Sequence, residues 1–440
     1  MQLHAPHPHR PRIVLATFGT YGDLHPFLAL ALALRERGAD PVLAAGEVFR
    51  AKVEAEGIGF HPMRPDVEAV ADRLALTPRQ LARAVASRPQ FLLQRILLPA
   101  LRDAYDDAMV AMRGADLVVT HSVAYGARLA AEKRGLLRVG IVLQPMLFAS
   151  ASDPPVIADM PRLSRWIYRL GPAWTRAFLA LGRRIARRWA QPIDAFRREV
   201  GLPPATAHPL FEGQFTGIGT IGLYSPLLEP PGTEHPPNTT IAGFAFYDSE
   251  HGGPSTLSPA LQAFLDGGAP PVVFTQGTSA VHDADDFVHE SLAAIDRLGM
   301  RAVLVLDEER VRRWSPHATA TIHVTGYAPY SALFPRAAIN VHHGGIGTTA
   351  QALRAGRPQL VTPYLVDQPD NAARVVRLGV GRALSRRAWR SANVAAALRA
   401  LMDQPGYRQA AARVGSQVAQ EEGARVAAGA ILSMLGQAAG

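Results

Sequence analysis

The feature that most constrains the fold is an alternation of short apolar strands with helices, which occurs twice along the chain. In the first part, an apolar run at 12–18 leads through a loop at 19–23 into a helix that begins near Pro26. Strands are also predicted at 41–45, 115–120 and 139–143, with a helix at 125–134. The second part has predicted strands at 272–275, 302–306, 338–342 and 360–362, with helices at 286–298 and 348–355. Strands that alternate with helices in this way form parallel βαβ units.

A proline-rich segment separates the two parts. Residues 229–238 contain four prolines, so they can form neither a helix nor a central strand. We therefore predict an α/β protein with two doubly wound, Rossmann-like domains that face each other across a cleft. The predicted division is an N-terminal domain at 1–228, a linker at 229–240, a C-terminal domain at 241–400 and final helices at 401–440. A ligand is expected in the cleft, where the carboxyl ends of the strands meet.

The composition excludes several classes of protein. The 440 residues include no cysteine, which excludes a disulfide framework and a thiolate metal site. The longest nearly pure apolar run, 27–34, is far shorter than the roughly 20 residues of a membrane-spanning helix. The N-terminus lacks the apolar core of a signal peptide, so a cytoplasmic location is expected. The net charge is +9, but no nucleic-acid motif accompanies it, and no nucleic-acid partner is expected.

Residues 161–200 combine many arginines with aromatic residues such as Trp166 and Trp174. This pattern predicts one or two basic amphipathic helices. Such helices can present a solvated face above a buried stripe, or they can contact anionic lipid or an amphiphilic acceptor. Peripheral contact with the inner face of a membrane is therefore one expected interaction.

The segment 340–350 predicts a binding site for phosphate. Its sequence runs from a strand through a glycine-rich loop into a helix. Gly345 and Gly347 allow backbone amides to approach an anion, and the helix N-terminus adds about half a positive charge. His343 can donate a hydrogen bond to a diphosphate leaving group. A tight turn without a ligand and a structural role for His343 are the alternatives.

Two further patterns in this region bear on the ligand. Residues 345–350 also satisfy G-x-G-x-x-G/A, and Asp367 follows about 20 residues later, as in nicotinamide-dinucleotide sites. An NAD(P)-dependent oxidoreductase is therefore an alternative function. Asp367 and Gln368 offer adjacent acceptors and donors that suit the vicinal hydroxyls of a sugar. Helix capping by Asp367 or Asp370 is the structural alternative.

On the basis of these residues, the stretch 327–371 resembles the donor-binding signature of family 1 glycosyltransferases. These are nucleotide-sugar-dependent enzymes of GT-B fold. The resemblance implies that Tyr327 stacks on the nucleobase, with Ala328 beside it. It further implies that His343 and Thr348 contact the diphosphate, together with Gly345, Gly347 and Thr278. Asp367 and Gln368 would hold the sugar hydroxyls. Plant members have tryptophan and glutamine where this chain has Tyr327 and Tyr330.

The resemblance covers essentially the whole chain. The loop at 19–26 is similar to the first loop of bacterial members, and 274–278 is similar to the first strand and loop of the donor domain. The combination of this donor-domain loop with 261–266 and 367–372 looks most like the rhamnosyltransferases that build rhamnolipids. The resemblance also implies that the helices at 401–440 cross back to the first domain.

In this family the catalytic base lies in the first loop, three residues before a proline, which is the position of Asp23. A carboxylic acid with a pKa near 4 cannot deprotonate an alcohol outright, so the proton must move as the sugar–oxygen bond forms. A role for Asp23 as the N-cap of the following helix is the structural alternative and is compatible with catalysis. His25 is the competing base.

Plant members orient their catalytic histidine with an aspartate that follows a later strand. The corresponding stretch, 119–122, contains His121 and no carboxylate, so a dyad of that kind is not expected. His25, His121 and Met146 are candidates for contact with the acceptor. Asp283 and Asp285 form a D-x-D pattern, but GT-B enzymes use a helix dipole and side chains in place of a metal. No metal and no other cofactor are expected.

These observations predict an inverting, metal-independent glycosyltransferase. The donor would be a UDP- or dTDP-linked rhamnose or hexose. The acceptor would be a lipophilic hydroxylated small molecule, with a hydroxy fatty acid first and a polyketide or sterol next. A sugar-nucleotide-binding protein without turnover is the remaining alternative, beside the oxidoreductase.

Overall fold

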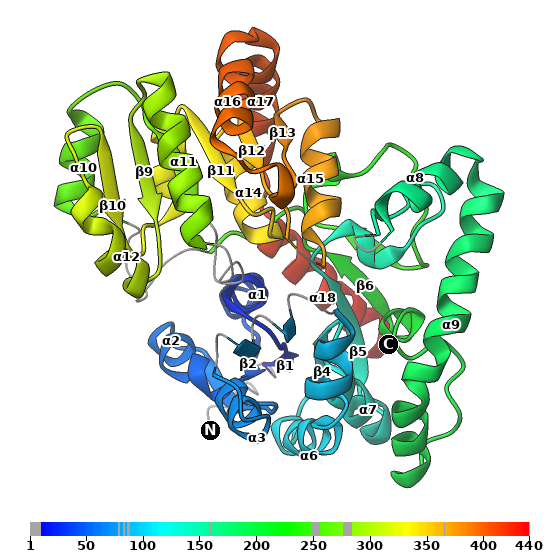
Figure 1. Cartoon of the computed structure of the whole chain (residues 1–440). Helices are drawn as coiled ribbons and strands as arrows, with labels where there is room; N and C mark the ends of the chain where they lie inside the picture. Colours follow the sequence, from blue (N-terminus) through cyan, green and yellow to red (C-terminus); the bar gives the residue numbers. More distant parts are fainter. Residues whose placement is uncertain are drawn as a thin grey trace, which may run out of the picture.

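Two parallel sheets form the centre of the molecule (Figure 1). The computed structural model describes residues 10–77, 80–81, 84–85, 89–157, 160–247, 256–275, 284–364 and 366–439. In spatial order, the first sheet contains β3 (Gly59–Pro62), β2 (Asp40–Ala45), β1 (Arg12–Ala16), β4 (Leu117–His121), β5 (Leu137–Val142), β6 (Gly219–Gly222) and β7 (Thr239–Ile241). The second contains β10 (Ile322–Thr325), β9 (Ala302–Val305), β8 (Val272–Thr275), β11 (Ile339–His342), β12 (Gln359–Val361) and β13 (Gly381–Ala383). Both orders are those of a doubly wound Rossmann-like sheet, so the predicted fold class is confirmed.

Helices cover both faces of each sheet. The first domain contains α1 (Tyr21–Glu36), α2 (Arg50–Ala55), α3 (Val67–Arg73), α5 (Pro89–Phe91), α6 (Leu101–Ala111), α7 (Tyr125–Arg134), α8 (Pro161–Arg169) and α9 (Pro172–Glu199). The second contains α10 (Pro259–Asp266), α11 (Ala284–Leu298), α12 (Glu308–Trp314), α13 (Tyr330–Leu333), α14 (Ile346–Arg354), α15 (Gln368–Arg377), α16 (Ser391–Asp403) and α17 (Pro405–Val418). Within β1, Ile13 and Leu15 pack on the α1 side, whereas Val14 and Ala16 pack against α6 and α7. Burial on both faces explains why the strands are almost entirely apolar.

The order of the strands determines where ligands can bind. In the first sheet successive strands are added outward from β1 on one side and then from β4 on the other, and in the second sheet the same change of side occurs between β8 and β11. In doubly wound sheets the loops diverge at this point and leave a crevice beyond the carboxyl ends of the strands. The sequence-predicted site residues that follow β1, β4 and β11 therefore belong to the two crevices.

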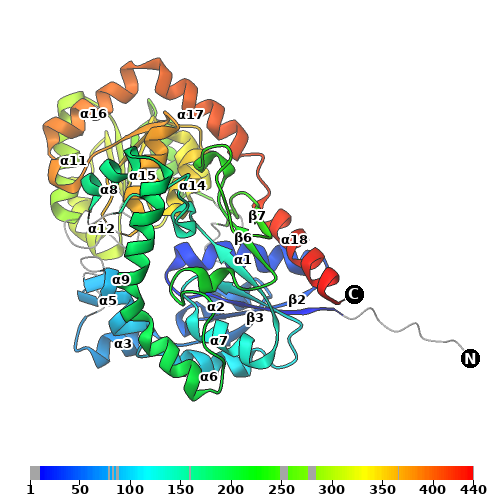
Figure 2. The same ribbon diagram turned by 90° about the vertical axis from the view of Figure 1, so that its right-hand side faces the viewer.

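The chain crosses between the domains twice, and the two crossings touch. The outward crossing contains Gly243, and the return crossing contains Gly423, where a Cβ would lie 2.3 Å from the Gly243 carbonyl oxygen. The Phe244 amide also donates a hydrogen bond to Glu421 Oε2 (2.9 Å). Of the final helices, α16 and α17 cover the second domain, and only α18 (Gly423–Ala439) packs on α1 of the first (Figure 2).

The expected linker at 229–240 ends inside the first sheet. Thr239–Ile241 form β7, which pairs with β6 in parallel. Three residues without prolines are enough to add an edge strand, and the proline-rich pattern before them conceals it. Side-chain contacts hold the preceding part of the segment in place. Glu229 accepts a hydrogen bond from Tyr224 Oη (2.7 Å) and contacts His235 Nε2 at 2.9 Å.

The helices α8 and α9 confirm the expected helical segment at 161–200 and pack on each other. Tyr168 and Phe178 face one another between them, with ring centroids 6.1 Å apart. Trp166 and Trp174 instead point outward and are 59% and 61% exposed. Across the part of the chain that the structure describes, no helix has the length and apolar character needed to cross a bilayer.

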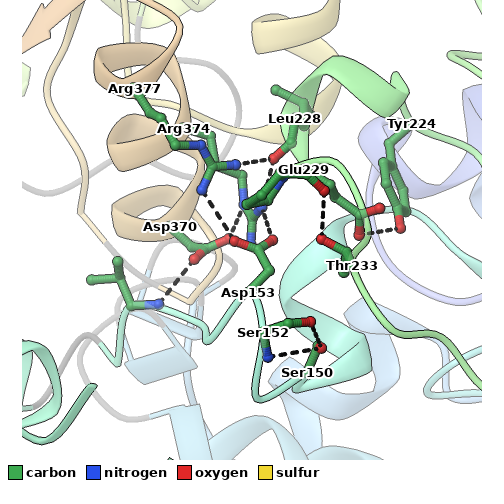
Figure 3. A network of polar contacts seen from close by, with 12 residues as sticks. Ser150, Ser152, Asp153, Tyr224, Leu228, Glu229, Thr233, Asp370, Arg374 and Arg377 are labelled. Atoms are coloured by element: carbon green, nitrogen blue, oxygen red, sulfur yellow. Dashed lines mark hydrogen bonds and ion pairs between the residues drawn. The ribbon is translucent and has the colours of Figure 1, made fainter. Parts of the chain in front are cut away.

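A buried ion network joins the domains (Figure 3). Arg374 of α15 is only 2% exposed and forms ion pairs with Asp370 of its own helix and with Asp153 of the first domain. Its Nη1 also donates to the Leu228 carbonyl oxygen (2.6 Å), and Arg377 contacts Asp153 at 3.1 Å. Asp370 Oδ1 in turn accepts a bond from the Val156 amide (2.9 Å). The charges are thus paired and hydrogen-bonded, which burial requires.

Replacing Arg374 should destabilise the protein strongly. The Arg374→Met change leaves two carboxylates buried without their main partner, so we expect a loss of about 3–5 kcal/mol in the free energy of unfolding. Urea unfolding and the thermal midpoint measure this loss. The matched control is Arg12→Met, which removes an exposed pair with Asp40 and should cost less than about 1 kcal/mol. Equal stability of the two variants would contradict the structural role of the network.

Candidate active site

Asp23 lies in the first turn of α1, immediately after the loop that follows β1. Thr20 is the N-cap residue, and its hydroxyl accepts a hydrogen bond from the Gly22 amide (3.2 Å). Asp23 Oδ2 accepts one from the Thr20 amide (2.8 Å), which completes a capping box. The N-cap role considered for Asp23 therefore belongs to Thr20. A Cβ at Gly19 would lie 2.0 Å from Asp23 Oδ2, so the loop backbone covers this oxygen.

The other oxygen of Asp23 faces His121. Because β1 and β4 pair in parallel, with Ala16 beside Thr120, their ends lie side by side. His121 Nε2 lies 3.7 Å from Asp23 Oδ1, and the two side chains are 7% and 31% exposed. Burial lowers the pKa of His121, and the negative charge of Asp23 acts in the opposite direction. The stretch after β4 lacks a carboxylate, as expected, yet it supplies a histidine partner to Asp23.

The other two acceptor candidates lie around this pair. His25 packs between Tyr21 and Tyr247, with ring centroids at 5.4 and 5.1 Å, whereas Asp23 faces His121. Met146 is half-buried in the short helix η3 (Pro145–Phe148), which follows β5 beside β4. A small apolar recess also lies at this end of the sheet, lined by Phe18, Met63, Leu97, Val123 and Tyr125 among others.

The two histidines of the glycine-rich loop have different roles. His342 uses both ring nitrogens: Nε2 contacts Gln359 Oε1 (3.0 Å), and Nδ1 accepts from the Gly344 amide (3.1 Å). His343 is 5% exposed, and its Nδ1 has no hydrogen-bond partner among the described residues. Burial lowers the pKa of His342 to about 4 and that of His343 to about 3, so both rings are neutral at pH 7.

The ring of His343 lies over the start of α14. A Cβ at Gly345, the N-cap residue, would lie 2.5 Å from His343 Nε2, so only glycine fits there. A Cβ at Gly347 would meet no other described atom within 4 Å, and Thr348 is half-buried one residue further on. The first turn of α14 therefore presents amides and a hydroxyl beside an imidazole, which is the donor set an anion needs.

Asn371 connects this loop to the start of α15. Its Nδ2 donates to the Gly344 carbonyl oxygen (2.9 Å) and to Asp367 Oδ2 (2.8 Å). Asp367 occupies the N-cap position of α15, but its side chain makes no capping hydrogen bond. Helix capping therefore does not account for the aspartate at this position. Gln368 is buried, and its Oε1 accepts from the Tyr364 amide (2.8 Å).

The charge of Asp367 links the two domains. The pKa of this carboxyl is raised to about 7, mainly by burial, and the negative charge of Asp23 contributes in the same direction. Hydrogen bonds from its own backbone and from Asn371 act in the opposite direction. Because Asp23 belongs to the first domain, this influence means that the two carboxylates lie within electrostatic range across the domain interface.

The remaining residues considered in the sequence differ in exposure and in their contacts. Tyr327 is 52% exposed, as a stacking surface must be, whereas Ala328 is buried. Tyr330 is buried, shares a hydrogen bond with Thr275 (2.6 Å) and stacks on Phe334. Thr278 and Asp283 lie outside the described residues. Asp285 is paired with Arg313 and with Trp314 Nε1.

Sequence reasoning missed two contacts of this region. Asn371 was not singled out, although it lies four residues after Asp367, a spacing at which helical side chains meet. The pairing of His121 with Asp23 was also missed, because the two residues are far apart in sequence. Only the parallel pairing of β1 with β4 brings them together.

Comparisons with known proteins agree with this arrangement. Residues 13–140 match the glycosyltransferase family 28 N-terminal domain, and 288–431 match the erythromycin biosynthesis protein CIII-like C-terminal domain. The chain is 32% identical over 430 residues to O-mycaminosyltylonolide 6-deoxyallosyltransferase of Streptomyces fradiae, with 94% of each chain covered. It is 29% identical to vancomycin aglycone glucosyltransferase of Amycolatopsis orientalis, covering 84% of this chain and 85% of that one.

Solved structures show the same fold. The crystal structure of the glycotransferase of kitacinnamycin has a TM-score of 0.69 at 21% identity, covering 97% of this chain and all of that one. The fold and the site thus define a two-domain GT-B enzyme. The chain belongs to the GT-B glycosyltransferases that include the 6-deoxyallosyltransferase. The predicted resemblance and the predicted enzyme class are confirmed, and the oxidoreductase alternative is set aside.

The electrostatic link between Asp23 and Asp367 can be measured directly. We expect the Asp367 carboxyl to titrate near pH 7, and the Asp23→Asn change should lower its pKa because a like charge is removed. NMR titration of ¹³C-labelled aspartate measures both values, with the Asp367 signal assigned by its loss in Asp367→Asn. The control, Asp40→Asn, changes an exposed carboxylate and should leave the Asp367 titration unchanged. An unchanged Asp367 pKa in Asp23→Asn would mean that the two side chains do not face each other.

Proposed function

We propose that this enzyme transfers a sugar from a nucleoside diphosphate to a hydroxyl group of a lipophilic natural product, with inversion at the anomeric carbon. The observation that carries the proposal is the contact between α14 and α1, in which Ile346 at the start of α14 packs against the core around Phe27 and Leu28, so that the glycine-rich loop lies against the helix that carries Asp23. A base on one domain then faces a sugar- and diphosphate-binding site on the other. This arrangement supports direct transfer between the two substrates.

In the proposed mechanism, the oxygen of the acceptor hydroxyl attacks the anomeric carbon, and Asp23 Oδ1 takes the proton of that hydroxyl at the same time. The bond from the anomeric carbon to the diphosphate oxygen breaks at the same time, and its electrons leave with the diphosphate. Attack from the opposite face inverts the configuration. The amides at the start of α14, the Thr348 hydroxyl and the neutral His343 ring would stabilise the leaving charge, at about 3 kcal/mol for a well-placed donor.

The donor side supports a sugar with adjacent hydroxyls. Above pH 7 Asp367 is an ionised acceptor held by Asn371, with buried Gln368 beside it. Exposed Tyr327 offers a surface for stacking of the nucleobase. The relative that is 32% identical is named for transfer of 6-deoxyallose, a 6-deoxy sugar, as rhamnose is. We therefore propose a UDP- or dTDP-linked 6-deoxyhexose, with a metal-independent mechanism in which α14 and His343 stabilise the diphosphate.

The acceptor proposal changes with the comparisons. A hydroxy fatty acid was the first expectation, but the reported relatives are named for O-mycaminosyltylonolide and the vancomycin aglycone. We therefore propose a polyketide-like aglycone as the acceptor, with the hydroxy fatty acid as a competing substrate in the assay.

Removal of the base should separate turnover from donor binding. With dTDP- and UDP-sugars and a panel of macrolide aglycone, sterol and 3-hydroxyacyl acceptors, mass spectrometry should detect a glycosylated product from the wild-type enzyme. Asp23→Asn should lower turnover by at least about 100-fold, since a positioned base contributes that much. Calorimetry should show nearly unchanged donor affinity for the same variant.

The matched variant is His343→Ala, which removes a diphosphate donor and should weaken donor binding. Normal turnover by Asp23→Asn would overturn the assignment of the base. Unchanged donor affinity and turnover in His343→Ala would show that the diphosphate binds elsewhere. Preference for the 3-hydroxyacyl acceptor would restore the first expectation for the substrate.

We also propose that α8 and α9 contact a membrane with anionic lipid. The support is the exposure of Trp166, Trp174 and Leu181 together with that of Arg176 and Arg184 on the same two helices. Tryptophan favours the interface between lipid and water, and arginine is attracted to anionic headgroups.

Vesicle binding tests this contact. The protein should sediment with phosphatidylglycerol-containing vesicles and less with pure phosphatidylcholine, and high salt should release it. Trp166→Ala with Trp174→Ala should abolish sedimentation. Val48→Ala, which alters an exposed apolar residue of the first domain that is 63% exposed, should leave it unchanged. Equal sedimentation of all variants would contradict the proposal and favour a solvated helical face.

A further inference from the structure

The position of His121 points to a function that goes beyond contact with the acceptor. His121 is the last residue of β4, and Asp23 follows the neighbouring strand β1. We propose that His121 is a positioning residue that orients the Asp23 carboxylate for proton transfer, by donating a hydrogen bond from Nε2 to Oδ1. This inference rests on the proposed role of Asp23 as the base.

The two oxygens of Asp23 are not equivalent. Oδ2 accepts from the Thr20 amide at 2.8 Å and lies beneath Gly19, so the loop occupies it. Oδ1 is therefore the oxygen that remains for the acceptor hydroxyl, and it is the one that faces His121. The Thr20 hydroxyl also donates to Oδ2 (3.4 Å), so both donors from the loop hold this one oxygen and neither holds Oδ1. A second donor on Oδ1 fixes the plane of the carboxylate and thus the direction of its free lone pair.

The surroundings of His121 determine which ring nitrogen carries the proton. Among the described residues, Nδ1 has no hydrogen-bond partner, and the ring of Phe27 lies edge-on at a centroid distance of 5.9 Å. A buried N–H without a partner is costly. A lone pair on Nε2 would in addition face the negative charge of Asp23. Both effects favour the neutral ring with its proton on Nε2, directed at Asp23.

The observed separation suits a contact that tightens during the reaction. At 3.7 Å, Nε2 and Oδ1 are beyond the length of a hydrogen bond. Catalytic hydrogen bonds are often long before substrate binds and shorten in the reacting complex. His121 is nearly inaccessible, at 7% side-chain exposure, whereas Asp23 is 31% exposed. Asp23 is thus the residue that an acceptor can reach, and His121 acts through it.

Two substitutions distinguish positioning from other roles of His121. His121→Phe keeps the size of the ring but removes the donor, so kcat should fall about tenfold to 100-fold, with donor KM unchanged. His121→Gln places an amide N–H near the position of Nε2, and we expect it to recover most of kcat. His208→Gln is the control, because it alters a histidine of the same domain that contacts the Arg183 carbonyl oxygen instead.

The pH profile provides a second test. Among the described residues, the titratable groups placed near Asp23 are His121 and, across the interface, Asp367. At saturating donor, the acid limb of kcat should move to higher pH in His121→Phe, because the charged form of the base loses a donor. The limb should return toward its wild-type position in His121→Gln.

The outcomes separate this inference from the proposed function. Wild-type kcat in His121→Phe would overturn the positioning role. A His121→Gln variant that folds normally but is as inactive as His121→Phe would show that the imidazole itself takes the proton. Full activity in Asp23→Asn would instead overturn the proposed base, whatever the His121 variants do. Thermal unfolding midpoints close to wild type confirm that the variants are folded.

Discussion

The ion network around Arg374 is the contact on which the geometry of the candidate site depends. Helix α15 carries Asp367 and Gln368 at its start, and Asp370 and Arg374 within its next turns. Arg374 binds Asp153 of the first domain, which follows the short helix that contains Met146. One helix therefore holds the proposed sugar-binding residues and also fixes them to the first domain. A buried guanidinium is stable only when its partners are in place, so this contact favours a single relative placement of the domains.

Parallel pairing explains how distant residues meet at that interface. Each candidate residue follows the carboxyl end of a strand: Asp23 follows β1, His121 ends β4, and His343 follows β11. Neighbouring parallel strands end at the same edge, so Asp23 and His121 meet without any local sequence signal that links them. In the second sheet, parallel pairing likewise places the glycine-rich loop beside the start of α15, where Asn371 joins the loop to the helix.

The sequence was sufficient for the features that local patterns encode. The alternation of strands and helices predicted two Rossmann-like domains, and glycines before a helix predicted the loop around Gly345. Features that depend on tertiary contacts could not be predicted. Asp153 and Arg374 are paired across two domains, and β7 is a three-residue edge strand that follows prolines. The structural role of Asp23 also differs from the N-cap role expected from the sequence. Thr20, one turn earlier, is the N-cap residue, and Asp23 completes the capping box with it.

The pKa values indicate which groups of the candidate site change charge near neutral pH. Both histidines at the glycine-rich loop are neutral at pH 7, so the diphosphate would be bound by dipoles and N–H groups rather than by an imidazolium. Their titration then contributes nothing to the pH dependence of donor binding near neutrality. Asp367, with a pKa of about 7, is the group whose charge changes there. Protonation of Asp367 would also remove its repulsion with the Asp23 carboxylate. A bound sugar would favour the ionised form of Asp367, because its hydroxyl groups donate hydrogen bonds to the carboxylate. These hydrogen bonds would have to offset the repulsion.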